Sequence, residues 1–252
     1  MNLFENISVL LFDLDNTLLF LDENKFVISY ASNLATYFND VFQDPKIFIH
    51  HLLEGTKFMV NTHTSEKNIE KFFHYFVPHC KNLSKEVIYK RFLDFYNNEF
   101  DNVKYIVRPS PVAPKVFENA LRKGFDIVIS TNPIFPEIAT KKRLIWAGLE
   151  NYIDNLLLIT HGEQFTTTKP DMEYYKQILD IIGRNANECL MIGNDIYNDG
   201  SASLIGMKYY QLLLSTSNSE ADFLSKETQK LVDITQIHVT SSGTLEDFYK
   251  LL

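Results

Sequence analysis

Residues 9–18 of the chain read Val-Leu-Leu-Phe-Asp-Leu-Asp-Asn-Thr-Leu. The first four are apolar without alternation, which is typical of a strand buried on both faces of a parallel sheet. Such a sheet needs helices on both of its faces, so the stretch predicts an α/β fold. The run stops at Asp13, and a second carboxylate, Asp15, follows two residues later. A polar turn directly after a buried strand is the first indication of a binding site.

Apolar runs of the same kind recur along the chain and alternate with amphipathic stretches of helical length. Strands are expected at residues 8–12, 125–130, 156–160, 189–192 and 208–214. Helices are expected between them at residues 114–123, 136–147, 171–182 and 199–205. This alternation predicts a Rossmann-like, doubly wound parallel sheet.

One block interrupts the alternation. Between residues 22 and 105 helix follows helix, at 28–42, 46–59, 66–77 and 85–97, with no strand-like run among them. A block of that length is large enough for a helical bundle of its own. We therefore expect an α/β core domain formed by residues 1–21 and 106–252, with a helical domain of residues 22–105 inserted after the first strand.

Composition and charge narrow the range of partners. The 252 residues are 45% hydrophobic and carry 24 basic against 32 acidic side chains, a formal net charge of −8. This charge disfavours non-specific binding to nucleic acid, which depends on cationic side chains. The first apolar run is too short for a signal peptide or a membrane helix, and the two distant cysteines, Cys80 and Cys189, fit no disulfide framework. We expect a cytoplasmic protein, monomeric or homodimeric, with no membrane or nucleic-acid partner.

Chemistry-bearing residues follow four of the expected strands. In an open parallel sheet, ligands bind beyond the carboxyl ends of the strands. The residues at those positions are Asp13 and Asp15 after the first strand, Thr131 and Asn132 after the second, Lys169 in the loop after the third, and Asn194, Asp195 and Asp199 after the fourth. We expect these four loops to meet at one edge of the sheet.

The residue types indicate what such a site binds. Several carboxylates close together repel one another unless a cation lies between them. Oxygen ligands alone favour Mg²⁺, which commonly shares its coordination shell with a substrate phosphate. The hydroxyl of Thr131 and the ammonium group of Lys169 are suited to hold an anionic group next to the metal. The set therefore predicts a magnesium-dependent site for a phosphoryl group.

Four motifs, in this order, resemble those of the haloacid dehalogenase superfamily. They are Asp-Leu-Asp-Asn-Thr-Leu at 13–18, Ser-Thr-Asn at 130–132, Lys-Pro at 169–170 and Gly-Asn-Asp-x-x-x-Asp at 193–199. The resemblance covers residues 7–22 and 106–215. The helical insert resembles the α-helical (C1-type) cap of that superfamily in position and type only. The resemblance implies a hydrolase with a Rossmann-like core and an inserted helical cap.

The resemblance also implies a role for each matching residue. Asp13 would attack phosphorus and form an aspartyl phosphate. Asp15 would protonate the leaving oxygen and then deprotonate the water that hydrolyses the intermediate. Thr131 and Asn132 would bind the phosphoryl oxygens together with Lys169, which would also steady the charge of the nucleophile.

For the metal, the resemblance implies Mg²⁺ held by the Asp13 carboxylate, the main-chain carbonyl of Asp15 and the Asp195 carboxylate. Many members of the superfamily have an aspartate where this chain has Asn194, directly after a glycine. Asn194 and Asp199 therefore stay open as alternatives to Asp195.

Four functions are compatible with these residues, and one is favoured. Dehalogenases of the superfamily that act on carbon–halogen bonds typically lack the second carboxylate, so Asp15 favours phosphate esters. We expect a Mg²⁺-dependent phosphatase that hydrolyses a small phosphorylated metabolite, whose identity the sequence does not indicate. The alternatives are a phosphotransferase that passes the phosphoryl group to a sugar hydroxyl, a phosphonate-cleaving enzyme that uses Lys57 for a Schiff base, and a non-catalytic phospho-acceptor module. The large insert argues against the last, because an insert that closes over the site excludes water.

Overall fold

A six-stranded parallel sheet forms the centre of the computed structural model, which describes residues 3–81, 83–213 and 232–252. The strand order is β5-β4-β1-β6-β7-β8, so the first strand lies inside the sheet between β4 and β6. The strands are β1 (Val9–Phe12), β4 (Asp126–Ile129), β5 (Leu158–Ile159), β6 (Cys189–Gly193), β7 (Lys208–Leu212) and β8 (Ser241–Gly243). The predicted α/β fold with a parallel sheet is confirmed.

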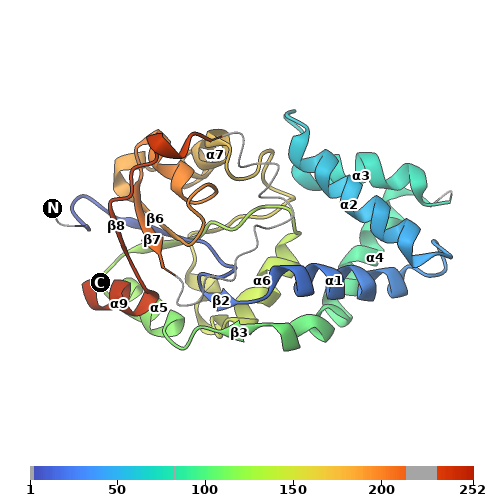
Figure 1. Ribbon diagram of the computed structural model, residues 1–252, viewed down its shortest axis with the longest axis horizontal. Coiled ribbons are helices and arrows are strands. Elements are labelled where there is room, and N and C mark those ends of the chain that lie inside the picture. The colour runs from blue at the N-terminus through green and yellow to red at the C-terminus, as the bar shows by residue number, and fades with distance from the viewer. Residues whose placement is uncertain (1–2, 82, 214–231) are drawn as a thin grey trace.

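Helices cover both faces of this sheet (Figure 1). The side chains of β1 pack against helices on both sides. Leu10 and Phe12 pack on one side with residues of α5 and α9, whereas Val9 and Leu11 pack on the other side with residues of α7. The helices of the core are α5 (Ala113–Arg122), α6 (Glu137–Trp146), α7 (Met172–Ile182) and α9 (Leu245–Leu251). Successive side chains of a strand point to opposite faces, so an unbroken apolar run is buried on both.

The register of the three central strands aligns their carboxyl ends. Phe12 lies opposite Ile129 in β4 and opposite Ile192 in β6. The next residues continue this alignment. Asp13 N–H donates to the Ile192 carbonyl oxygen (3.0 Å), and Ser130 N–H donates to the Phe12 carbonyl oxygen (2.7 Å). The loops that carry most of the predicted site residues therefore begin side by side.

The helical insert, residues 22–105, gathers at one end of the molecule, away from both chain termini (Figure 1). Its helices are α1 (Glu23–Tyr37), α2 (Pro45–Asn61), α3 (Asn68–Phe76) and α4 (Lys85–Asn98). A 3₁₀ helix at Val77–His79 lies between α3 and α4, and another, Phe100–Ile106, follows α4. These helices share one core that is rich in buried aromatic side chains. The helical character of the block is as expected, and its limits as a separate domain stay a prediction.

Helix α1 has different ends from those expected. It begins at Glu23 instead of residue 28, because the side chain of Asp22 accepts a hydrogen bond from Lys25 N–H (3.1 Å) and caps the helix. It ends at Tyr37 instead of residue 42. Phe42 lies beyond the end of the helix and is nevertheless buried in the insert core. Its apolar character is therefore no evidence that the helix extends to it.

Two short strands join the insert to the core. The strands β2 (Leu19–Phe20) and β3 (Arg108–Pro109) pair in antiparallel fashion, with Leu19 opposite Pro109. This pairing could not be predicted from the sequence, because two residues are too few to show the period of a strand. The chain thus enters and leaves the insert through neighbouring segments.

The C-terminal part of the core departs from the expectations in three ways. Residues 199–205, expected as an α-helix, form a 3₁₀ helix, η5 (Gly200–Ile205), in which Ala202 N–H donates to the Asp199 carbonyl oxygen three residues back. The strand expected at 208–214 ends at Leu212, and residue 214 lies outside the described residues. Strand β8 and helix α9 were not expected, since the Ser-Ser-Gly of β8 carries no apolar signal. In the described part of the chain, no helix combines the length and the apolar character that spanning a membrane would need.

Candidate active site

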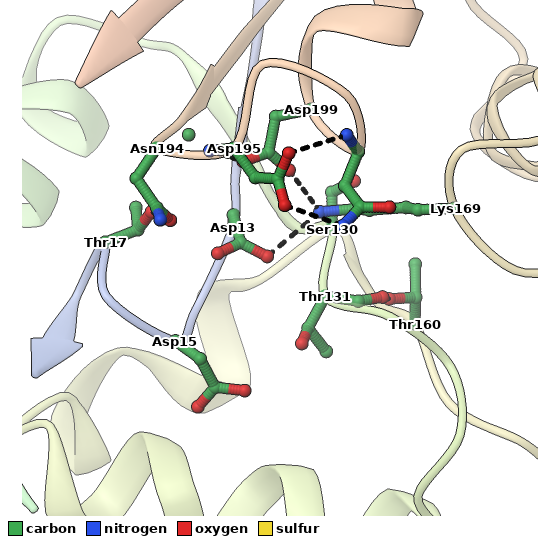
Figure 2. Close-up of polar contacts among 12 residues, drawn as sticks. Asp13, Asp15, Thr17, Ser130, Thr131, Thr160, Lys169, Asn194, Asp195 and Asp199 are labelled. Carbon is green, nitrogen blue, oxygen red and sulfur yellow. Dashed lines mark hydrogen bonds and ion pairs between the residues drawn. The ribbon is translucent and has the colours of Figure 1, made fainter. Parts of the chain in front are cut away.

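Lys169 connects the loop after β1 with the loop after β6 (Figure 2). Its Nζ donates to Asp13 Oδ1 at 2.9 Å and to Asp199 Oδ1 at 2.6 Å. The side chain of Lys169 is 2% exposed, that of Asp199 is 1% exposed and that of Asp13 is 13% exposed. Charged hydrogen bonds out of solvent are strong and fix the positions of their partners. Asp13 is therefore held at the outer side of a buried charged cluster.

Burial governs the protonation of this cluster. It raises the pKa of Asp13, an effect that the Lys169 ammonium opposes. It raises the pKa of Asp199 to about 7, again against Lys169. For Lys169, burial favours a lower pKa, but Asp13 and Asp199 together hold it well above its ordinary value. Lys169 is therefore a cation at neutral pH, as a group that offsets negative charge has to be.

Hydroxyl groups fix the loop after β4. The Thr131 carbonyl oxygen accepts hydrogen bonds from the Thr160 hydroxyl (2.6 Å) and from the Tyr174 hydroxyl (2.9 Å). Ser130 Oγ lies 3.1 Å from the same Tyr174 hydroxyl. All four side chains are buried. The main chain of Thr131 is thus held from β5 and α7 while its side chain lines the cleft described below. The sequence did not single out Tyr174, which reads as one apolar position of an amphipathic helix.

In the loop after β6, the side chain of Asp195 is hydrogen-bonded within the loop, whereas that of its neighbour Asn194 is hydrogen-bonded outside it. Both carboxylate oxygens of Asp195 accept from their own loop: Oδ1 from the N–H groups of Tyr197 (2.8 Å) and Asn198 (3.0 Å), and Oδ2 from Asn198 Nδ2 (2.8 Å). Asn194 reaches the first loop instead, where its Oδ1 accepts from the Thr17 hydroxyl at 3.1 Å. The side chain of Asn194 therefore connects the first and fourth motifs.

Asp199 is buried and links the loop after β6 to Lys169. Besides accepting from Lys169, it accepts from Asp195 N–H through Oδ2 at 3.0 Å. A Cβ at residue 193 would overlap the Asp199 carboxylate, so this close approach requires Gly193. Across the described residues, no three His, Cys, Asp or Glu side chains converge as a metal site. The metal ligands, Asp195 among them, stay a prediction.

Asp15 pairs with a residue that the sequence reasoning missed. Arg143 Nη1 donates to Asp15 Oδ2 at 2.5 Å, and the Arg143 side chain is 2% exposed. Figure 2 shows Asp15 apart from the hydrogen-bonded cluster around Lys169. A signal was present in the sequence. Arg143 follows Ala139 by four positions, which places a basic residue on the buried face of α6.

A cleft of about 1650 Å³ gathers the predicted site residues. Its wall includes all eight of them: Asp13, Asp15, Thr131, Asn132, Lys169, Asn194, Asp195 and Asp199. Side chains of the insert, among them Tyr30 and Phe72, line the same cleft. Lys57 is not among the described residues that line it, and pairs with Glu54 at 3.0 Å within α2. The four loops meet at one edge of the sheet, as expected, and the role of each residue stays a prediction.

Comparison with known families agrees with this geometry. A family model described as haloacid dehalogenase-like hydrolase matches residues 7–203, a range that contains all four loops and the whole insert. The chain belongs to this hydrolase family. A search of the curated proteins found no match to this hydrolase.

Solved structures of the same fold match this hydrolase over nearly its whole length. A HAD phosphatase from Thermococcus onnurineus is 15% identical, with a TM-score of 0.58 and 97% of each chain covered. A predicted phosphoglycolate phosphatase from Haemophilus somnus is 15% identical, with a TM-score of 0.55 and 98% of each chain covered. A putative β-phosphoglucomutase from Thermotoga maritima is 16% identical, with a TM-score of 0.54 and coverage of 97% and 98%. Dehalogenases also match, so the likeness shows the fold and leaves the reaction to the site.

Proposed function

We propose that this hydrolase is a Mg²⁺-dependent phosphatase that acts on a small phosphate monoester through an aspartyl phosphate on Asp13. The observation that carries the proposal is the pairing of Asp13 with the buried Lys169 ammonium at 2.9 Å, beside a second cleft carboxylate, Asp15. A nucleophile, a fixed cation and a separate acid–base group are the parts that phosphoryl transfer through an enzyme ester requires.

The reaction has two balanced steps. In the first, an Asp13 carboxylate oxygen bonds to phosphorus, the ester P–O bond breaks with its electron pair on the leaving oxygen, and a proton that Asp15 carries when the substrate binds passes to that oxygen. In the second, a water oxygen bonds to phosphorus, one water proton passes to Asp15, and the P–O bond to Asp13 breaks. Both aspartates then have their starting state. Lys169 and Thr131 hold the phosphoryl oxygens and offset their charge.

The donor set fits Mg²⁺. Asp13 and Asp199 share the Lys169 ammonium, and the nearby Asp195 carboxylate adds negative charge that further raises the pKa of buried Asp199. A site with this excess of negative charge and only oxygen donors suits a hard divalent cation. Asp13, the Asp15 main-chain carbonyl and either Asn194 or Asp195 would hold it. When bound, Mg²⁺ supplies positive charge to the phosphoryl oxygens.

Phosphate release from a panel of phosphate monoesters tests the proposal. We expect turnover with Mg²⁺ and none after EDTA treatment. Asp13→Asn removes the nucleophile, so we expect kcat to fall by about 10⁴-fold or more with the fold retained. Asp126→Asn is the matched control, because Asp126 pairs with Arg184 (2.9 Å) at the opposite end of the sheet. Full activity of the Asp13→Asn variant contradicts the assignment of the nucleophile.

The same assay separates a phosphatase from a phosphotransferase. An acceptor sugar is added to the reaction, and both free phosphate and phosphorylated sugar are measured. We expect free phosphate as the product. Phosphorylated sugar in excess of free phosphate would assign the chain to the phosphotransferases.

A further inference from the structure

Arg143 is a buried cation outside the cluster around Lys169. It lies in α6, and among the described residues the only hydrogen bond of its side chain goes to Asp15. The guanidinium carbon lies 4.8 Å from the centre of the Phe135 ring. The Phe135 ring in turn contacts the Tyr30 ring of the insert, with centroids 5.5 Å apart. Arg143 therefore lies where the core, the insert and the cleft meet.

The two side chains of this ion pair use only part of their hydrogen-bonding capacity. Within residues 3–81, 83–213 and 232–252, Arg143 Nε and Nη2 have no hydrogen-bond partner, and neither has Asp15 Oδ1, although all three atoms are buried. A guanidinium offers five N–H donors, and a buried donor without an acceptor costs free energy. Apolar residues of similar volume often replace a buried ion pair without loss of stability. Stability alone therefore does not explain why an arginine lies here.

The two oxygens of Asp15 have different surroundings. Oδ2 is bound to Arg143, and Oδ1 is unpartnered among the described residues. The two carboxylates of the first loop also have separate cations, Lys169 for Asp13 and Arg143 for Asp15. Figure 2 shows the Asp15 side chain outside the dashed network that joins Asp13 to Lys169. Asp13 and Asp15 are thus paired with different cations.

We propose that Arg143 is a positioning residue for Asp15: it holds one carboxylate oxygen and thereby fixes the orientation in which this carboxylate meets the leaving oxygen of the substrate. This inference rests on the proposed function, in which Asp15 exchanges a proton with that oxygen. Phe135 and the packing of α6 fix the guanidinium, so the carboxylate has one orientation instead of several. In this role Arg143 acts through Asp15 and makes no contact with the reacting atoms.

Leaving groups of different acidity separate this role from a general effect on the fold. Dinitrophenolate leaves without a proton, whereas an alkoxide needs one. For Arg143→Met we expect kcat/KM, which reports the steps up to release of the leaving group, to fall about 10²–10⁴-fold for an alkyl phosphate that the wild type hydrolyses, the usual contribution of a general acid, and to fall less than about tenfold for dinitrophenyl phosphate. Arg143→Lys keeps the charge without the planar guanidinium, so its losses should lie between those of Arg143→Met and the wild type. Equal losses with both esters overturn the proposal.

Arg91→Met is the matched control. Arg91 also pairs with an aspartate, Asp40, through two hydrogen bonds of 2.6 and 2.7 Å, and also lies over a ring, 5.8 Å from the centre of Phe38. None of these three residues lines the cleft. We expect Arg91→Met to hydrolyse both esters at the rates of the wild type. A preferential loss with the alkyl phosphate in this control contradicts a role specific to Arg143.

A crystal structure of Arg143→Met tests the positioning without turnover. We expect the Asp15 side chain in a different rotamer, and an unchanged Asp15 overturns the proposal. If the methionine variant does not fold, the Arg143→Lys structure answers the same question through the position of Asp15 Oδ2. A different result would contradict the proposed function: the wild type would release no phosphate from any monoester in the presence of Mg²⁺.

Discussion

The carboxyl edge of the sheet and the helical insert are held together by different kinds of contact. At the sheet edge the contacts are polar and join distant parts of the chain, such as Lys169 with Asp13 and Thr17 with Asn194. In the insert core many of the buried side chains are aromatic and contact one another, as where Phe76 stacks on Phe72 with centroids 5.1 Å apart. The first kind of contact depends on direction, and the second depends on shape and volume.

This difference separates two tasks. Hydrogen bonds and ion pairs place individual atoms, which is what a reaction at phosphorus requires. A core of packed rings fixes the helices but tolerates changes of side chain as long as volume is kept. The sheet edge can therefore keep one chemistry while the wall that the insert contributes to the cleft changes with the substrate. Substitutions in the two regions should therefore have different effects.

Removal of the central cation at the sheet edge should have the largest effect. Lys169→Met leaves Asp13 and Asp199 buried without their partner, which we expect to lower the free energy of unfolding by about 3–5 kcal/mol and to reduce kcat by about 10³-fold or more. Chemical denaturation and phosphate release measure the two effects. Lys176→Met, which removes an exposed lysine paired with Glu173 at 3.6 Å, should change neither. A stable and active Lys169→Met variant would mean that the polar cluster does not define the site.

Loss of one ring in the insert should affect stability alone. Phe76 is fully buried, so Phe76→Ala should lower the free energy of unfolding by about 3–5 kcal/mol, through lost burial and the cavity left behind. Phe58→Ala, at a ring that is 39% exposed in α2, should cost much less. Neither variant should change kcat for dinitrophenyl phosphate while the protein is folded. A loss of kcat in Phe76→Ala that persists under folding conditions would show that the two regions are not independent.

The smallest expected effect is a dependence of stability on pH in the insert. Burial, together with the charges of His79 and His50, lowers the pKa of His51 below its ordinary value of 6.5. Because the folded state binds fewer protons than the unfolded state, this contribution is complete above about pH 6.5 and is lost as the pH falls below it. The ring of His51 stacks on that of His79 (3.9 Å between centroids), so His51→Phe keeps the stack and removes the titration.

Thermal unfolding between pH 8 and pH 5 measures this effect. Between pH 8 and pH 5 the melting temperature of the wild type should fall more than that of His51→Phe. His238→Phe is the control, because His238 is an exposed histidine of the α/β core domain. The melting temperature of this variant should depend on pH as that of the wild type does. Identical pH profiles for the wild type and His51→Phe would contradict the prediction.

The sequence predicted the sheet edge well because its signal is local. Each strand is an apolar run that stops at a polar loop, and Asp13, Thr131 and Asn194 follow such runs directly. Parallel topology then brings the ends of the runs together. Lys169 does not follow its strand directly, but lies in the loop between β5 and α7, and the Lys-Pro motif identified it.

Pairings between side chains and the short elements could not be predicted in the same way. Arg143 lies in an ordinary amphipathic helix, and its partner Asp15 is distant in sequence, so no local pattern connects them. The pairing of β2 with β3 depends on segments that lie on either side of the whole insert. The sequence favours Asp195 as a metal ligand because it is a carboxylate. The backbone of its own loop, which its oxygens accept from, is a competing partner that composition does not show.

The antiparallel pairing of Leu19–Phe20 with Arg108–Pro109 has a consequence for how this protein can be altered. The two points at which the insert is attached are hydrogen-bonded neighbours, so a short hairpin turn could replace everything between them without rethreading the sheet. The insert could in this sense be replaced without a change in the order of the strands of the sheet. A chain with a different set of helices at this junction could keep the same sheet edge.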